Sequence, residues 1–282
     1  MSNANLDIVE FVSKLEDPRS RDCPHNFSEI VITTICAAVC GMLEWDEIVF
    51  FATENKDWLK EKLKIDFSNG IPSHFTFARV ISSIEPTAFS KIFTAWIQAA
   101  YPPKENQVIA IDGKSLRGSY PETKGADLTH IVNAMACDTG ITLAQLEVQD
   151  KENEITAIPK LLEYLDIRKS IITMDAMGSQ KSIAKVIRDY KGDYIFAIKA
   201  NRKHLFQSLK LRFEEVRNDQ TKSQFKQKEF VTRSENQHGR VEERTCLVIP
   251  VSQLSADQEN EIAQWQDVKT AVEITYTHTH KK

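Results

Sequence analysis

Long hydrophobic runs are missing from this sequence of 282 residues. Its apolar stretches all fall short of the roughly 18 residues that a membrane span needs. The first residues, MSNANLDIVEF, also lack the basic and then apolar pattern of a signal peptide. The expectation is a soluble, cytoplasmic protein without a membrane partner.

Cysteine is scarce, and its spacing argues against a structural zinc site. The five cysteines are scattered, and no C-x-x-C pair occurs among them. Cys36 and Cys40 are four residues apart, but they lie in the apolar run IVITTICAAVCGML, where small buried residues are the simpler interpretation. All five are expected to be free thiols.

Positive charge is not in excess, since 36 Lys and Arg stand against 40 Asp and Glu, a net charge of -4. This net charge argues against a protein that holds DNA through overall positive charge, because phosphate contacts require clusters of Lys and Arg. A local cluster is present between Lys199 and Arg244, with twelve basic against seven acidic residues. This stretch is either a nucleic-acid surface or a solvated face.

The first hundred residues have helical periodicity. LDIVEFVSKL is amphipathic, FSEIVITTICAAVCGML is apolar on nearly every side, and EWDEIVFFATENKDWLKEKL continues in helical register. Ser73 or Thr76 can cap the next helix, and Pro86 fits the first turn of another. The sequence YPPKEN then breaks the pattern. We predict a helical domain over 1–103 and a second domain over 104–282.

The second domain has the pattern of a mixed α/β sheet. VIAID, HIVNAMACD and ITLAQLEVQ read as three strands, and after them helices alternate with the strands SIITMD and DYIFAIK. Beyond Gln220 three further strands are predicted. The predicted fold class is α/β, a helical N-terminal domain followed by a ribonuclease H-like mixed sheet with extra C-terminal strands.

Two of the predicted strands, the first and the fourth, end in an acid, Asp112 and Asp175. Sites in α/β sheets form at strand ends, and the first and fourth strands are neighbours in the ribonuclease H-like fold. Paired carboxylates repel unless a cation lies between them, and Mg²⁺ and Mn²⁺ prefer oxygen ligands. Asp112 and Asp175 are therefore the predicted metal ligands. The alternative is that each aspartate only caps the turn that follows it.

Several segments occur in a specific order: IAIDGKSLRGS, ITMDAMGSQKSIAKVI, GDYIFAIKANRKHL and QHGRVEER, preceded by DPRSRDCPHNFSEIV and NGIPSHFTFARV. Together they resemble the H-repeat-associated and ISAs1-like transposases of the DDE type, over nearly the whole chain. The resemblance implies that Asp112 and Asp175 are the first two catalytic acids, with Mg²⁺ or Mn²⁺ as cofactor. It also implies double-stranded DNA as partner, both insertion-sequence ends and target, and a homodimer.

The resemblance implies a third acid in a C-terminal helix with a pattern like R-x-H-W-x-I-E-N, and no such pattern occurs before Lys282. The catalytic domain is therefore expected to be cut short, which leaves strand transfer in question. Glu214, Glu215 and Glu242 are substitutes to consider, although each fits a solvated carboxylate better.

Other residues are candidates for contact with DNA. The helix in PSHFTFARVISSI would turn His74, Thr76 and Arg79 outward as a recognition helix, or serve only as scaffold. Basic and imidazole side chains near the predicted strand ends and in the basic stretch are the other DNA-binding candidates: Lys114, Arg117, Lys199, Arg202, Lys203, His238 and Arg240.

Three functions remain open at this point. The first is a metal-dependent transposase that cleaves and joins DNA at insertion-sequence ends. The second is a non-catalytic DNA-binding remnant of such a transposase. The third is a ribonuclease H-like nuclease that works with two aspartates and a substitute glutamate.

Overall fold

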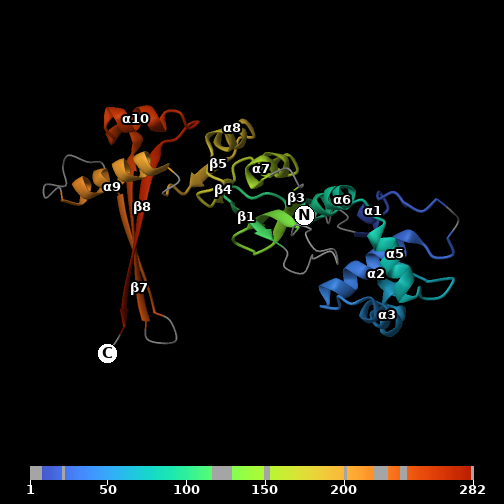
Figure 1. Ribbon diagram of the computed structural model, residues 1–282. Coiled ribbons are helices and arrows are strands. Elements are labelled where there is room, and N and C mark those ends of the chain that lie inside the picture. Colours follow the sequence, from blue (N-terminus) through green and yellow to red (C-terminus); the bar gives the residue numbers. More distant parts are fainter. Residues whose placement is uncertain are drawn as a thin grey trace, which may run out of the picture.

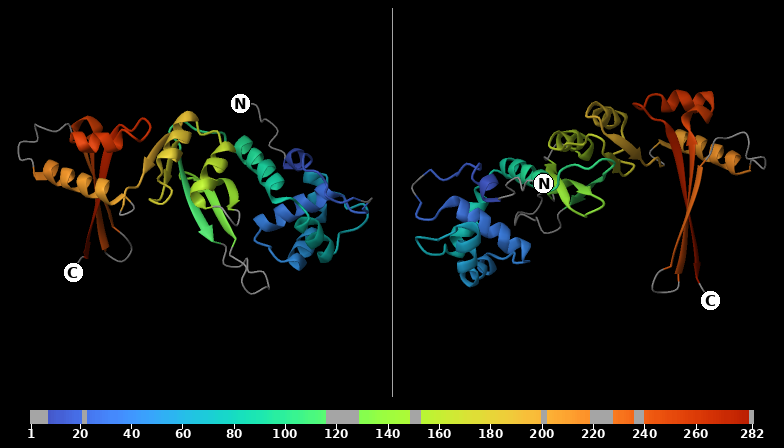
Figure 2. Two further views of the ribbon diagram at one scale, coloured as in Figure 1. Left: turned by 45° about the horizontal axis from the view of Figure 1, so that its top comes forward. Right: turned by 180° about the vertical axis from the view of Figure 1, so that it is seen from behind.

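The computed structural model describes residues 8–20, 23–115, 129–148, 153–199, 202–218, 228–235 and 240–280. Three parts follow one another along the chain in Figure 1: a group of helices, a five-stranded sheet with helices, and a three-stranded sheet with helices. The five-stranded sheet lies between the other two parts in every view of Figures 1 and 2.

The first part is helical, as its periodicity predicts. Its elements are α1 (Ile8–Val12), α2 (Phe27–Val39), α3 (Trp45–Glu54), α4 (Lys56–Leu63), α5 (His74–Ser82) and α6 (Pro86–Ala100). Buried side chains from α2 to α5 form its core, among them Ile30, Leu59 and Phe77, each fully buried. This core is separate from that of the sheet.

Local signals explain where these helices begin. The side chain of Ser73 accepts a hydrogen bond from the backbone N–H of Thr76 and starts α5, and Pro86 occupies the first turn of α6, as predicted. The continuous helix predicted from Trp45 onward is wrong, because the chain breaks at Asn55 into α3 and α4. Helical periodicity continues across this break and conceals it.

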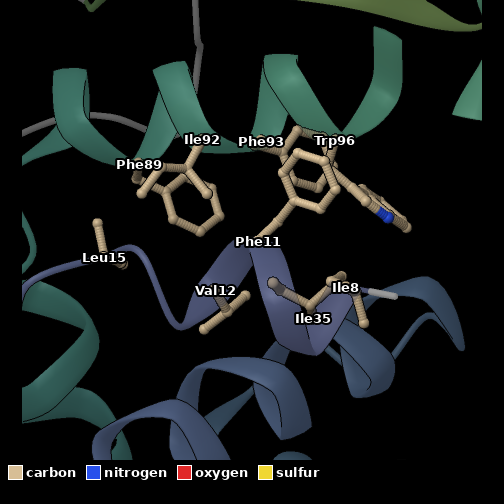
Figure 3. Close-up of a pocket in the computed structure, with 9 residues that line it drawn as sticks. All are labelled: Ile8, Phe11, Val12, Leu15, Ile35, Phe89, Ile92, Phe93 and Trp96. Carbon is tan, nitrogen blue, oxygen red and sulfur yellow. The ribbon is translucent and has the colours of Figure 1, made fainter. Parts of the chain in front are cut away.

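Helix α1 packs against α6, and the space between them is lined only by apolar side chains (Figure 3). Phe11 and Val12 of α1 face Phe89 and Phe93 of α6, with Ile35 of α2 beside them. Such a lining offers no group that could bind or transform a polar substrate. This contact is therefore part of the packing of the helical part.

The five-stranded sheet has the order β3-β2-β1-β4-β5. Its strands are β1 (Val108–Ser115), β2 (His130–Ala136), β3 (Thr142–Val148), β4 (Ile171–Met174) and β5 (Asp193–Phe196). The first three pair antiparallel, and β4 and β5 run parallel to β1. This mixed order is that of a ribonuclease H-like sheet and confirms the predicted fold class.

Helices cover this sheet and bury its core. α7 (Glu154–Glu163) contacts β2 and β3, α6 contacts β3, and α8 (Lys181–Asp189) contacts β5 and α7. Ile109 and Ile111 of β1, Ile172 of β4 and Leu161 of α7 are buried in one cluster. The central strands β1 and β4 are therefore fixed by packing of their buried side chains against α7.

The third part joins α9 (Lys203–Asn218) and α10 (Ala256–Ile262) to a sheet of β6 (Lys228–Glu235), β7 (Arg240–Pro250) and β8 (Thr270–His280). The three strands confirm the extra C-terminal strands that the sequence predicts. The short 3₁₀ helix η2 (Val251–Gln253) and α10 were not predicted. α10 begins with a capping box between Ser255 and Gln258, a signal that is readable in the sequence.

A segment between α10 and β8 attaches this third part to the edge of the five-stranded sheet. The Tyr194 hydroxyl donates to the backbone oxygen of Gln266 at 2.7 Å, and the rings of Phe196 and Trp265 meet edge to face at 6.1 Å. Arg188 of α8 forms an ion pair with Asp267 at 3.1 Å.

Among the helices of the described ranges, none is long and apolar enough to cross a membrane.

Candidate metal centre at the ends of two parallel strands

Asp112 and Asp175 are brought to the same edge of the sheet by the pairing of β1 with β4. The register places Ile111 opposite Met174, and the residue that follows each of them in the sequence is an aspartate. Neighbouring strands lie about 4.8 Å apart, so the two aspartates occupy adjacent positions where the pairing of β1 with β4 ends, while β1 itself continues beside β2 to Ser115. Both are exposed to solvent. The prediction that they are neighbours in space agrees with this register.

The carboxylate of Asp175 is oriented by its own turn. Its Oδ1 atom accepts hydrogen bonds from the backbone N–H groups of Met177 at 2.9 Å and Gly178 at 3.0 Å. The Ser179 hydroxyl donates to the backbone oxygen of Asp175 at 2.7 Å. Oδ2 takes part in no hydrogen bond within the described ranges. Asp175 therefore caps the turn with one oxygen and presents the other, so the two interpretations of this residue are compatible.

A carboxylate that no sequence pattern indicated lies against Gly113, the residue after Asp112. A Cβ atom placed on Gly113 would stand 2.9 Å from Oε2 of Glu154 and still closer to its Oε1 and Cδ atoms. The absence of a side chain at Gly113 allows the carboxylate to take this position, and any other residue there would require the Glu154 side chain to move. The signal in the sequence was the Asp-Gly pair at the strand end, but a glycine does not reveal which side chain approaches it.

The basic candidates are distributed over different parts of the molecule. Lys114 is exposed and lies on the same face of β1 as Asp112, because alternate residues of a strand share a face. Lys199 precedes α9 and Lys203 is the first residue of α9, and both are exposed. Arg202 instead donates to Gln180 at 2.9 Å and lies over the ring of Trp265, 5.8 Å from its centre.

For three other DNA-binding candidates the structure describes no side chain. Arg117 and His238 lie outside the described residues, and of Arg240 only the backbone is described, at the start of β7. On α5, Arg79 is exposed, whereas His74 forms an ion pair with Asp46 at 3.2 Å that depends on protonation of the imidazole.

The substitutes considered for a third acid lie in the third part of the molecule. Glu214 and Glu215 belong to α9, where Glu215 pairs with Arg212 at 2.8 Å, and Glu242 belongs to β7 and pairs with Arg244 at 3.4 Å. α9 and β7 lie beyond β5 in Figures 1 and 2, away from the edge where β1 ends. The structure does not bring these glutamates to the two aspartates.

The residues at this edge fit a magnesium-type ion, by two observations. The donor set consists of carboxylate oxygens, and Mg²⁺ is typically held by one or two carboxylates together with water and substrate phosphate. Gly113 also has no side chain, and the Glu154 carboxylate occupies the place that a Cβ atom would take there. Within the described part of the chain, no three His, Cys, Asp or Glu side chains already stand together as a metal-binding group.

Two sequence families match the chain. The family described as "Transposase DDE domain" matches residues 103–275, and the family described as "DDE_Tnp_1-associated" matches residues 9–97. The chain belongs to the DDE transposase family. The resemblance deduced from the ordered segments is thereby confirmed, and Asp112 and Asp175 both lie inside the matched DDE region.

Relatives of this DDE transposase family chain occur in Escherichia coli. "Putative transposase YncI" of strain O157:H7 is 40% identical over 263 residues, which are 93% of this chain and 65% of the relative. Its K12 counterpart is 40% identical over 87% of this chain and 96% of its own length. "H repeat-associated putative transposase YhhI" of K12 is 38% identical over 86% of this chain and 63% of the relative. The chain thus spans about two thirds of the length of some relatives and nearly all of another.

Among solved structures, the chain is similar to the piggyBac transposase in a synaptic complex with hairpin DNA. The TM-score is 0.36 and the sequence identity is 13%, over 87% of this chain and 54% of that chain.

Proposed function

We propose that this chain is a DDE-type transposase that cleaves phosphodiester bonds and transfers strands at insertion-sequence ends with the help of Mg²⁺ or Mn²⁺. The observation that carries the proposal is the delivery of Asp112 and Asp175 by adjacent parallel strands. Membership in the DDE transposase family supports it, because the matched region contains both residues. Double-stranded DNA is the substrate that follows from this proposal.

The two aspartates would share the task of holding the cation. Asp175 enters the site with Oδ1 fixed by two backbone N–H groups, so its carboxylate loses little freedom when Oδ2 takes a ligand. The carboxylate of Asp112 is exposed, and within the described ranges it has no hydrogen-bond or ion-pair partner that it would lose on binding a cation. A bound divalent cation would activate the attacking oxygen of water or of a 3′-hydroxyl and stabilise the leaving oxygen.

The side chain of Lys114 fits a role in positioning DNA. It follows Asp112 by two residues on the same face of β1 and is exposed. A phosphate that approaches the two carboxylates would experience their negative charge, and a lysine at this place would reduce that repulsion. Lys203, exposed at the start of α9, is the second cation that we assign to DNA.

The remnant hypothesis, DNA binding without catalysis, has one observation in its favour. No ready group of three metal ligands exists within the described residues, although a full DDE site has three acids. Under that hypothesis Asp112 and Asp175 would bind no cation, while the basic side chains would still bind DNA. Metal binding therefore separates the two functions.

The test is a calorimetric titration of Mg²⁺ and Mn²⁺ into the chain and into the Asp112→Asn/Asp175→Asn variant. The proposal expects binding by the parent and none by the variant, with nicking of supercoiled plasmid DNA lost in the same variant. Asp189→Asn, a substitution of an exposed carboxylate at the end of α8, is the matched control and should retain both. Absence of binding in the parent would reject the catalytic proposal and favour the remnant.

A further inference from the structure

Helix α7 begins at the edge where the two aspartates leave the sheet. Its first residue, Glu154, lies against Gly113, which follows Asp112 directly. One helical turn later, Ile158 packs on Gly178 in the turn after Asp175, where an added Cβ atom would come within 3.3 Å of its Cδ1 atom. One face of α7 therefore contacts both β1 beside Asp112 and the turn that follows β4, because residues four apart share a helix face.

Glu154 is not needed to start the helix. The capping box of α7 is formed by Asn153 and Thr156: the Asn153 side chain accepts from the Thr156 N–H at 3.1 Å, and Thr156 Oγ1 accepts from the Asn153 N–H at 3.1 Å. Within the described ranges the carboxylate of Glu154 has no hydrogen bond and no ion pair. A favourable interaction with the helix dipole is open to any acid in the first turn and does not require the backbone approach at Gly113.

This carboxylate lies against the residue that follows Asp112 directly in β1. Consecutive Cα atoms are about 3.8 Å apart, so Glu154 contacts the backbone one residue away from Asp112. The three carboxylates do not stand together as one group within the described ranges, but no hydrogen bond or ion pair there holds the half-buried Glu154 side chain, so rotation about its own bonds can bring it toward Asp112. Mg²⁺ and Mn²⁺ accept up to six oxygen ligands, more than two aspartates supply.

We propose that Glu154 is a further carboxylate of the metal centre and contributes to cation affinity together with Asp112 and Asp175. The proposal rests on the proposed function, because it concerns the same site. Gly113 has the complementary role, since it is the residue that lets Glu154 approach β1. Glu154 would supply a metal ligand from α7, whereas the family resemblance implies that the third catalytic acid comes from a C-terminal helix.

Calorimetric titration of Mn²⁺ into the chain and its Glu154→Gln variant tests this inference. Glutamine keeps the size of the side chain and removes the charge, and the Kd for Mn²⁺ is expected to rise by about tenfold or more, as on loss of a supporting carboxylate. Glu163→Gln is the matched control, because it makes the same change at the exposed last residue of the same helix. Its Kd should equal that of the parent.

Thermal unfolding in EDTA provides the second readout, because a general defect in folding would lower the midpoint without any metal. Glu154→Gln should match the parent in EDTA and gain less stability when Mn²⁺ is added. Unchanged Mn²⁺ affinity in Glu154→Gln, with binding lost in Asp112→Asn, would overturn this inference and leave the proposed function standing. An equal loss in Glu154→Gln and Glu163→Gln would also overturn it. A parent that binds no cation would overturn both proposals.

Discussion

Two substitutions of Asp175, by asparagine and by alanine, separate its role in the turn from its role as a metal ligand. Asparagine retains an Oδ1 atom that can accept from the N–H groups of Met177 and Gly178, whereas alanine retains none. Asparagine lacks the negative charge that a divalent cation requires. Stability and metal binding should therefore respond differently to the two changes.

The magnitudes follow from the surroundings of the two donors. The side chain of Met177 is 60% exposed, so water can replace the lost acceptor there, but Gly178 is buried and its N–H would be left without a partner. Such a loss costs about 1–3 kcal/mol, and this is the expected destabilisation by Asp175→Ala. Asp175→Asn should stay within about 0.5 kcal/mol of the parent or be slightly more stable, because repulsion from Asp112 is relieved.

Urea unfolding without metal measures the stability of each variant, and calorimetric titration of Mn²⁺ measures binding. The expected result is a parent-like unfolding curve for Asp175→Asn, a lower midpoint for Asp175→Ala, and no Mn²⁺ binding by either. Mn²⁺ binding of parent strength in Asp175→Asn would refute the role of this carboxylate as a ligand. Equal destabilisation by both substitutions would refute the assignment of the turn to Oδ1.

Two further predictions concern the scaffold. Phe77→Ala removes a fully buried ring of α5 and should lower the free energy of unfolding in urea by about 3–5 kcal/mol. Phe75 lies two residues earlier and is 74% exposed, so Phe75→Ala should lower it by less than about 0.5 kcal/mol. Similar losses in the two variants would contradict the packing of α5. Burial raises the pKa of Tyr194 to about 12, above the value of about 10 that is usual for tyrosine. The neutral side chain therefore contributes its full stability below about pH 10, and this contribution is lost as the pH rises through 12. Alkaline unfolding followed at 295 nm should lose this dependence in Tyr194→Phe, and an unchanged profile would assign it to another group.

Periodicity alone was sufficient for most of the secondary structure. The helices of the first hundred residues and the two strands that lead to Asp112 and Asp175 follow from the spacing of apolar residues, which is a local property of the chain. The predicted end of the first strand at Asp112 is wrong, because β1 continues to Ser115. Periodicity did not predict the break at Asn55 or helix α10. Periodicity continues through the first, and the second is short and follows a predicted strand.

The neighbouring positions of Asp112 and Asp175 were also predictable, through the order of strands and the resemblance to a family. Strand order restricts which strand ends can meet, and with β4 parallel to β1 both aspartates come to one edge. The hydrogen bonds of Oδ1 in Asp175 agree with the local preference of aspartate for turns. At this level the sequence carries the information, because strand ends and turns are encoded within a few residues.

Glu154 became a candidate only through the tertiary structure. It stands 42 positions after Asp112 in the numbering, at the start of a helix where an acid is common and unremarkable. The same holds for Arg202, a basic residue in a basic stretch, which the fold uses against Trp265. The sequence by itself determined most of the elements, their order and the choice of Asp112 and Asp175, because these depend on local patterns and on the order of strands. Contacts between side chains distant in the chain were decided by packing, because a side chain acquires those neighbours only when helices and sheet come together.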